Sequence, residues 1–229
     1  MTSSQQMLKE AVAQAAAAEV PHGAILGVGT GSTVDCFIDA LAKAGVRLEA
    51  AISSSQRSSA RLQALGYRVI GLDSLKAPMD LYIDGADEID PSLCMIKGGG
   101  AALTQEKIVA SAARTFICIV DASKRVDLLG KFPLPIEVIE SAITPVSWAI
   151  RALGGDPRRR EGVLTDNGHP ILDVHGLQIA DPVGMETKLN QLPGIVTNGI
   201  FALRRADLAL MATTEGVRRL THSTGSPRN

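Results

Sequence analysis

The chain has 229 residues, of which 45% are hydrophobic and 21% charged, and its formal net charge is −1. This length and apolar content allow one large or two small domains with a real core, and they exclude a disordered chain. The near-neutral charge argues against a nucleic-acid scaffold, and an aromatic content of 3% leaves few rings for stacking on bases. Small and branched aliphatic residues fill the core, as is typical of parallel sheets covered by helices.

The cysteine and histidine residues show no spacing typical of a disulfide or metal site. Cys36, Cys94 and Cys118 lie far apart without a CxxC pair, so we expect buried thiols in a reducing compartment. The four histidines form no HExxH or comparable pattern. Apolar stretches are interrupted too soon for a membrane span, and residues 1–10 lack the pattern of a secretion signal. We therefore expect a cytoplasmic protein without a metal.

The first 120 residues alternate between helix and strand patterns. Apolar residues at helical spacing predict a helix at 5–20, and the apolar run 24–28 ends in a glycine turn before a helix that reaches residue 41. The elements expected next are strand 46–52, helix 56–65, strand 67–72, strand 81–83, helix 103–113 and strand 115–120. This alternation predicts a doubly wound α/β domain with a mainly parallel sheet.

The pattern changes at Phe132 and Pro133. The elements expected from there are strand 136–139, helix 144–153, strands 162–165 and 171–174, helix 182–192, strand 195–201 and strand 208–211. Asp181 and Pro182 mark a helix start, and the order up to residue 201 is that of a ferredoxin-like β-α-β-β-α-β module. We predict an α/β domain of residues 1–130 and 204–229, with a smaller α+β domain, 131–203, inserted into it.

Polar segments follow several predicted strands of the larger domain. They occupy residues 29–33, 53–55, 84–88 and 121–124. Ligands of open parallel α/β sheets bind beyond the carboxyl ends of the strands, which meet at one edge. We therefore expect hydroxyls, amides, carboxylates and a lysine to face one crevice.

The glycine turn at 27–33 has two interpretations. Glycines let the backbone approach a ligand closely, and the N-terminus of the following helix offers free N–H groups to a phosphate. The spacing is not GxGxxG and lacks the P-loop lysine, which favours a small phosphate ester over a nucleotide. The alternative is a structural turn in which Ser32 or Thr33 caps the helix.

The acidic loop places Asp84, Asp87, Glu88 and Asp90 within seven residues. The EF-hand register is absent, while a generic Mg²⁺ site and a solvated acidic turn both stay open. Asp84 directly follows an apolar strand, where a carboxylate would be half-buried and rigid. That setting suits acid–base chemistry.

A lysine precedes three consecutive glycines at 97–100, which predicts either an anion-binding nest or a flexible loop. Glu106 lies near the start of the following helix, where acids are ordinarily favoured. Lys124 has the equally ordinary interpretation of a surface lysine. The basic run at 158–160 is expected to be a solvated face.

Six segments in order carry a resemblance to a known family. They are GVGTGST at 27–33, DGADE at 84–88, KGGGAALTQEK at 97–107, DASK at 121–124, KFPLP at 131–135 and LTDNG at 164–168. Each motif alone is weak, but the whole series in this order with these gaps is specific. The chain resembles ribose-5-phosphate isomerase, type A, over nearly its whole length.

The resemblance implies interconversion of ribose 5-phosphate and ribulose 5-phosphate through an enediolate, without metal or organic cofactor. It implies that Glu106 moves the proton between C1 and C2, that Asp84 and Asp87 act near the oxygens, and that Lys97 or the backbone amides of the glycine nest stabilise the enediolate. The implied substrate-binding residues are Gly29, Thr30, Gly31, Ser32, Thr33, Asp84, Gly85, Ala86, Asp87, Lys97, Gly98, Gly99, Gly100 and Lys124. The implied partners are a sugar phosphate and further copies of the chain, as a homodimer or homotetramer, with no nucleic acid and no membrane.

Two other functions compete with this interpretation. A sugar-phosphate sensor of the same fold would usually carry a helix-turn-helix segment, and the sequence has no extra segment for one. A coenzyme A transferase half-domain would need a nucleophilic glutamate, and the segment 195–199 has Thr197 where such an acid would be sought. Both are therefore disfavoured.

Overall fold

The structure, a computed structural model, describes residues 3–221, which form three β-sheets. The largest sheet has the strand order β13-β12-β6-β3-β1-β2. Its strands are β1 (Ile25–Val28), β2 (Ala50–Ser53), β3 (Met79–Asp84), β6 (Ala113–Asp121), β12 (Leu208–Thr213) and β13 (Gly216–Thr221). All neighbours are parallel except β12 and β13. The prediction of an α/β protein with a mainly parallel sheet is confirmed.

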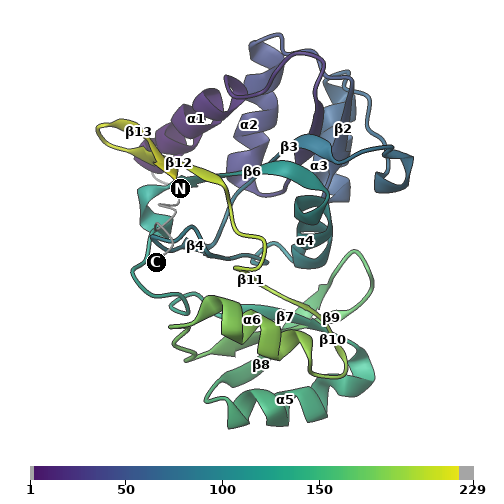
Figure 1. Cartoon of the computed structure of the whole chain (residues 1–229), viewed down its shortest axis with the longest axis vertical. Helices are drawn as coiled ribbons and strands as arrows, with labels where there is room; N and C mark the ends of the chain where they lie inside the picture. Colours follow the sequence, from purple (N-terminus) through teal and green to yellow (C-terminus); the bar gives the residue numbers. More distant parts are fainter. Residues whose placement is uncertain (1–2, 222–229) are drawn as a thin grey trace, which may run out of the picture.

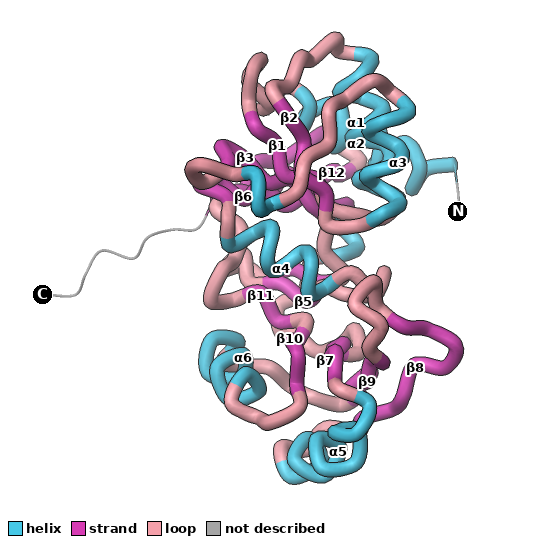
Figure 2. Tube along the Cα trace, turned by 90° about the vertical axis from the view of Figure 1, so that its right-hand side faces the viewer, coloured by secondary structure: helices cyan, strands magenta, loops and turns pink. Residues whose placement is uncertain are grey.

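Helices lie on both sides of this sheet (Figure 1). The helices are α1 (Ser3–Ala17), α2 (Ser32–Lys43), α3 (Gln56–Ala64) and α4 (Leu103–Ser111). Helices α1 and α2 share one buried cluster with β1, β3 and β6, whereas α4 contributes Val109 and Ala110 to a second cluster. Figure 2 shows α4 between the large sheet and the lower part of the molecule. Within residues 3–221, no helix is long and apolar enough to cross a membrane.

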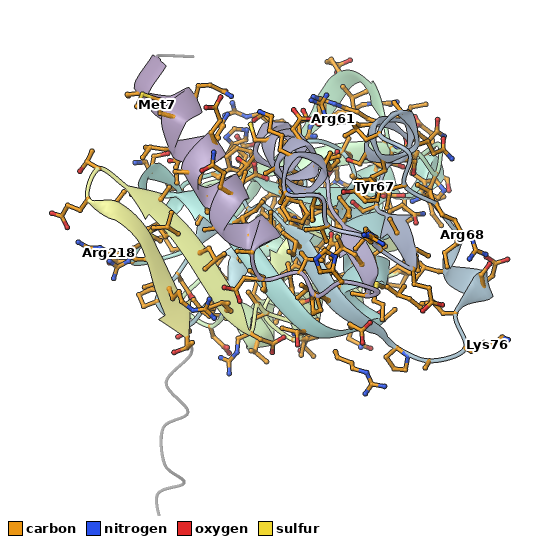
Figure 3. All side chains as sticks on the ribbon, turned by 90° about the horizontal axis from the view of Figure 1, so that it is seen from above. Met7, Arg61, Tyr67, Arg68, Lys76 and Arg218 are labelled. Carbon is orange, nitrogen blue, oxygen red and sulfur yellow. The ribbon has the colours of Figure 1, made fainter. Side chains whose placement is uncertain are left out.

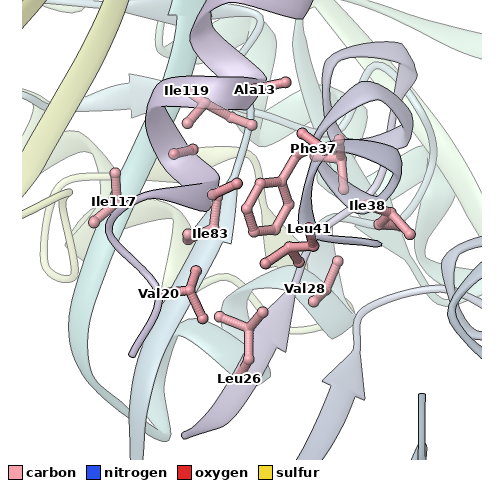
Figure 4. Close-up of a cluster of buried hydrophobic side chains, with 14 of the residues drawn as sticks. Ala13, Val20, Leu26, Val28, Phe37, Ile38, Leu41, Ile83, Ile117 and Ile119 are labelled. Carbon is pink, nitrogen blue, oxygen red and sulfur yellow. The ribbon is translucent and has the colours of Figure 1, made fainter. Parts of the chain in front are cut away.

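Phe37 lies at the centre of the core beneath α1 and α2 (Figure 4). Its ring lies between Leu41 of the same helix and Ile83 of β3, and all three side chains are fully buried. Burying one side chain of this size contributes ~1.5–3 kcal/mol. The inward residues of α2 also include Val34 and Ile38, at helical spacing. This packing holds the N-terminus of α2 just beyond the end of β1.

A second sheet, of four antiparallel strands, forms the lower part of the molecule (Figure 1). Its order is β10-β7-β9-β8. The elements here are β7 (Leu134–Val138), η3 (Glu140–Ala142), α5 (Ile143–Ala152), β8 (Asp156–Leu164), β9 (Pro170–His175), α6 (Pro182–Asn190) and β10 (Ile195–Asn198). Asp181 caps α6 by accepting a hydrogen bond from Gly184 N, with Pro182 in the first turn, as predicted.

The predicted strand 195–201 is wrong as a single element, because Gly199 divides it. Before Gly199, β10 pairs with β7, and after it, β11 (Ile200–Phe201) pairs with β5 (Met95–Ile96) in a small sheet that includes β4 (Glu88–Ile89). A side chain at Gly199 would lie 2.3 Å from Lys97 O, so only glycine allows this close approach. The small sheet therefore connects the two larger ones next to Lys97.

The edges of the large sheet also differ from the prediction. The expected strand 67–72 is wrong, since Val69 forms only an isolated bridge with Ala51 before the short helix η1 (Leu72–Ser74). Strand β13 was not expected, and it occupies the opposite edge. Figure 3 shows Arg218 of β13 and Lys76 on opposite sides of the molecule. Edge segments have one strand neighbour at most, so their sequence patterns are weak. The expectation for 222–229 lies outside the described residues.

Candidate active site

A cavity of about 490 Å³ lies beyond the carboxyl ends of β1 and β3, next to the N-terminus of α2. Its walls come from the glycine turn, the acidic loop, the 97–102 loop, α4, the short helix η2 (Ala122–Lys124), α1 and the β8–β9 hairpin. The predicted site residues that line it are Thr30, Gly31, Ser32, Thr33, Gly85, Ala86, Asp87, Lys97, Gly98, Gly99, Gly100, Glu106 and Lys124. Gly29 and Asp84 do not line it.

The glycine turn presents the open N-terminus of α2 to the cavity. Gly31 is the N-cap residue with φ +110°, a conformation that favours glycine, and no side chain of the described chain caps the helix. The alternative in which Ser32 or Thr33 caps the helix is therefore wrong. The uncapped N–H groups and the positive end of the helix dipole favour an anion at this point.

Lys9 of α1 is a cavity residue that the sequence analysis missed. Its Nζ donates a hydrogen bond to Ser32 Oγ at 2.8 Å, so a cation lies next to the open helix end. Lys9 is 6% exposed and continues the buried stripe that Val12, Ala13 and Ala16 form at helical spacing. A lysine in register with a buried stripe is the signal that could have identified it.

Asp84 is fully buried behind the cavity wall and holds other site residues in place. Its carboxylate accepts hydrogen bonds from the Tyr82 hydroxyl, from Lys97 Nζ at 2.7 Å and from the backbone N–H groups of Thr30 and Gly85 at 3.1 and 2.7 Å. A side chain at Gly29 would lie 1.9 Å from this carboxylate. Glycine at 29 therefore serves the close approach of Asp84.

Lys97 is a buried cation between two carboxylates. Burial alone would lower its pKa, but the charges of Asp84 and Glu106 outweigh that effect and raise it, so Lys97 stays protonated. Its Nζ donates to Asp84 Oδ2 at 2.7 Å and to Gly85 O at 2.6 Å. Glu106 Oε2 lies 3.3 Å away, on the cavity side.

Glu106 is the most perturbed carboxyl group of the cavity. Burial raises its pKa to about 8 from 4.5, the charges of Asp84 and Asp87 also raise it, and the attraction of Lys97 opposes the shift. Its Oε2 accepts no hydrogen bond from the described residues, although the side chain is only 4% exposed. A buried carboxyl whose pKa lies near neutrality suits proton transfer better than the ordinary role of an acid in a first helical turn.

Asp87 lines the cavity and is held by the glycine loop. Asp87 Oδ2 accepts a hydrogen bond from Gly99 N at 2.8 Å. A side chain at Gly99 would lie 2.7 Å from Asp87 Oδ1, so any larger residue at this position would displace the Asp87 carboxylate. Gly98 with φ +107° and Ala101 with φ +62° give the loop its left-handed turns. The loop is therefore a fixed support for Asp87.

The rest of the acidic loop points away from the cavity. Glu88 accepts hydrogen bonds from Gly130 N and Phe132 N, and Asp90 accepts them from Ser92 N and Cys94 N. Within residues 3–221, no group of three or more His, Cys, Asp and Glu side chains is placed to hold a metal ion. The four acids of this loop therefore do not form one cluster. Glu88 and Asp90 hold backbone N–H groups, Asp84 is buried behind the cavity wall, and Asp87 lines the cavity.

The fold and cavity define an α/β protein with a buried lysine–glutamate pair beside an uncapped helix N-terminus. The family model of ribose 5-phosphate isomerase A (phosphoriboisomerase A) matches residues 50–216. A ribose-5-phosphate isomerase A from Leptothrix cholodnii is 59% identical, over 94% of this chain and 98% of the relative, and one from Methylibium petroleiphilum is 55% identical over 94% and 98%.

Solved structures agree with these sequence matches. Ribose 5 phosphate isomerase A from Neisseria gonorrhoeae superimposes with a TM-score of 0.94 at 44% identity, covering 96% of this chain and 98% of that one. A D-ribose-5-phosphate isomerase in complex with phospho-erythronic acid superimposes with a TM-score of 0.90 at 38% identity, covering 94% and 98%. The chain belongs to the ribose 5-phosphate isomerase A family.

Proposed function

We propose that Glu106 is the base with which this chain, a ribose-5-phosphate isomerase, interconverts D-ribose 5-phosphate and D-ribulose 5-phosphate through an enediolate. The observation that carries the proposal is the position of Glu106, buried at the cavity and 3.3 Å from the Lys97 ammonium, with its pKa raised to about 8. A relative's complex with phospho-erythronic acid adds that a sugar-acid phosphate fits this family's fold.

The substrate phosphate binds at the N-terminus of α2. The backbone N–H groups and hydroxyls of Ser32 and Thr33 donate to its oxygens, and Lys9 supplies a positive charge through its contact with Ser32. A hydrogen bond to a charged group contributes ~1.5–3 kcal/mol. Lys124 also lines the cavity and adds a second cation. The other end of the substrate then reaches Glu106.

Proton transfer between C1 and C2 needs one base on one face of a planar intermediate. The ionised Glu106 removes the proton from C2 of the open aldose and returns it to C1, and the reverse direction uses the same group. Two of the Lys97 N–H groups are taken by Asp84 and Gly85. The ammonium charge of Lys97, 3.3 Å from Glu106 Oε2, stabilises the negative charge that develops on the enediolate oxygen.

Asp87 and Asp84 have different roles in this proposal. Asp87 lines the cavity and has only Oδ2 held by Gly99, so Oδ1 is placed to move protons at the sugar oxygens, including ring opening. Asp84 is enclosed by donors and holds Lys97, which makes it a positioning residue and not an acid or base. A well-placed acid–base group contributes ~10²–10⁴-fold to the rate.

The test is to follow ribose 5-phosphate by NMR in deuterium oxide with the purified chain. We expect ribulose 5-phosphate to form and deuterium to enter at the exchanging carbon, because the abstracted proton equilibrates with solvent on the base. Boiled protein is the control. Absence of ketose under conditions where a purified relative is active would contradict the proposal.

We further propose that the large domain is doubly wound and comprises residues 1–130 and 204–229, and that residues 131–203 form a ferredoxin-like module. What supports the module is its element order together with the strand order β10-β7-β9-β8. A cytoplasmic location, a homodimeric or homotetrameric state and independence of metal stay predictions.

A further inference from the structure

Three consecutive arginines on β8 have different environments. Arg158 pairs with Asp156 and Arg159 with Glu140, and their side chains are 65% and 43% exposed. Arg160 is 17% exposed and holds Asp173 of β9 through two hydrogen bonds, Nε to Oδ2 at 2.8 Å and Nη2 to Oδ1 at 2.5 Å. The expectation of a solvated face is therefore wrong for Arg160.

Arg160 also reaches the glycine loop of the cavity. Its Nη1 donates to Gly98 O at 3.1 Å and to Gly99 O at 3.2 Å. The planar guanidinium, oriented by Asp173, thus joins the four-stranded sheet to the loop that follows β5. A lysine cannot make these hydrogen bonds to Asp173 and the loop at the same time, because its ammonium is a point charge on a flexible stem.

The loop that Arg160 holds places two groups of the cavity. Lys97 is its first residue, and Gly99 N donates to Asp87 Oδ2 at 2.8 Å. The left-handed turn at Gly98, with φ +107°, allows the two carbonyl groups to face Arg160 while the next N–H faces Asp87. Without a cation on those carbonyls, the loop has fewer bonds to keep this arrangement.

We infer that Arg160, oriented by Asp173, is a positioning residue of this active site: it fixes the 97–100 loop and thereby the placement of Asp87 and Lys97. The inference rests on the proposed function of the cavity. Arg160 itself does not line the cavity, so it acts through the loop. The four-stranded sheet therefore supports the active site through one guanidinium.

The experiment compares Arg160→Met with Arg158→Met, which removes the same side chain from the same strand at an exposed position. Both variants are assayed for kcat and KM, for inhibition by inorganic phosphate and by phospho-erythronic acid, and for amide hydrogen exchange of peptides that cover residues 97–102. Arg160→Lys and Asp173→Asn are included because they keep the side-chain length or shape. These two variants test whether Arg160 holds the loop even where Arg160→Met fails to fold.

We expect Arg160→Met to lower kcat/KM at least ~10-fold, and Arg160→Lys to lower it by a similar factor. Arg158→Met should keep kcat/KM within ~2-fold of the value for the original chain. Exchange of the loop amides should be faster in Arg160→Met and Asp173→Asn but not in Arg158→Met. Inhibition by inorganic phosphate should not change, because the phosphate site at α2 is separate. We expect the sugar-acid chain of phospho-erythronic acid to reach from the phosphate site to the loop, so this compound should bind at least ~10-fold more weakly.

Unchanged loop exchange in folded Arg160→Met, or turnover within ~3-fold of the original chain, would overturn the inference. A parallel loss of phosphate and phospho-erythronic acid binding in the folded Arg160→Lys and Asp173→Asn variants would also overturn it, since the effect would then not be confined to the loop. The exchange measurement needs no turnover. If the original chain converts no ribose 5-phosphate, the proposed function fails while the exchange result still decides whether Arg160 holds the loop.

Discussion

The ionisation of Glu106 should control the pH dependence of the reaction. Burial raises the pKa of this group to about 8, and only the ionised carboxylate can accept a proton from carbon. With that pKa, the ionised fraction is about one-tenth at pH 7, about one-half at pH 8 and about nine-tenths at pH 9. We therefore expect kcat/KM to rise about fivefold from pH 7 to 8 and about twofold from pH 8 to 9.

The assay measures initial rates of ketose formation at substrate concentrations well below KM, because kcat/KM reports the free enzyme. The second pKa of a phosphate monoester is about 6, so the substrate is already about nine-tenths doubly ionised at pH 7 and adds little to the profile. Glu106→Gln keeps the size of the side chain and removes the base. It should lower kcat ~10²–10⁴-fold and slow exchange of the substrate C2 proton in parallel.

Two controls separate the base from its neighbours. Glu161→Gln removes an exposed glutamate of β8 and should leave rate and profile unchanged. Asp87→Asn should lose more activity on ring-closed ribose 5-phosphate than on an open-chain analogue. A flat profile between pH 7 and 9, or Glu106→Gln with nearly normal turnover and exchange, would refute the reasoning. Asp87 would then be the candidate base.

Three further predictions follow from the same contacts. Lys9→Met should raise KM at least ~10-fold with little change in kcat, because a charged contact at the phosphate is lost; an unchanged KM would remove Lys9 from the phosphate site. Gly29→Ala should lower Tm, by ~2–4 °C for each kcal/mol of unfolding free energy lost, because the alanine side chain would lie 1.9 Å from the Asp84 carboxylate. Calorimetry checks this, and an unaltered Tm would contradict it. EDTA should not inhibit turnover, and activity restored by Mg²⁺ after chelation would show that the acidic loop holds a metal.

Much of this protein follows from local patterns in its sequence. The helical stripe of α2 and the turn that follows β1 could be predicted, because side-chain spacing and glycine conformations act within a few residues. Asp87, Lys97 and Glu106 were also expected in the site and do line the cavity, since each lies in a short motif at the end of a strand or the start of a helix. The order of these motifs alone indicated the family that the comparisons show.

Tertiary structure decided which side chains face the cavity. Lys9 enters it from α1 and Arg160 supports it from β8, and neither stands in a motif with the residues it contacts. Asp84 is the last residue of β3, three positions before Asp87, but it is enclosed by Lys97 and backbone N–H groups. These contacts join residues that are 23, 62 and 13 positions apart. Periodicity cannot predict them, because the packing of whole sheets and helices determines which distant side chains meet.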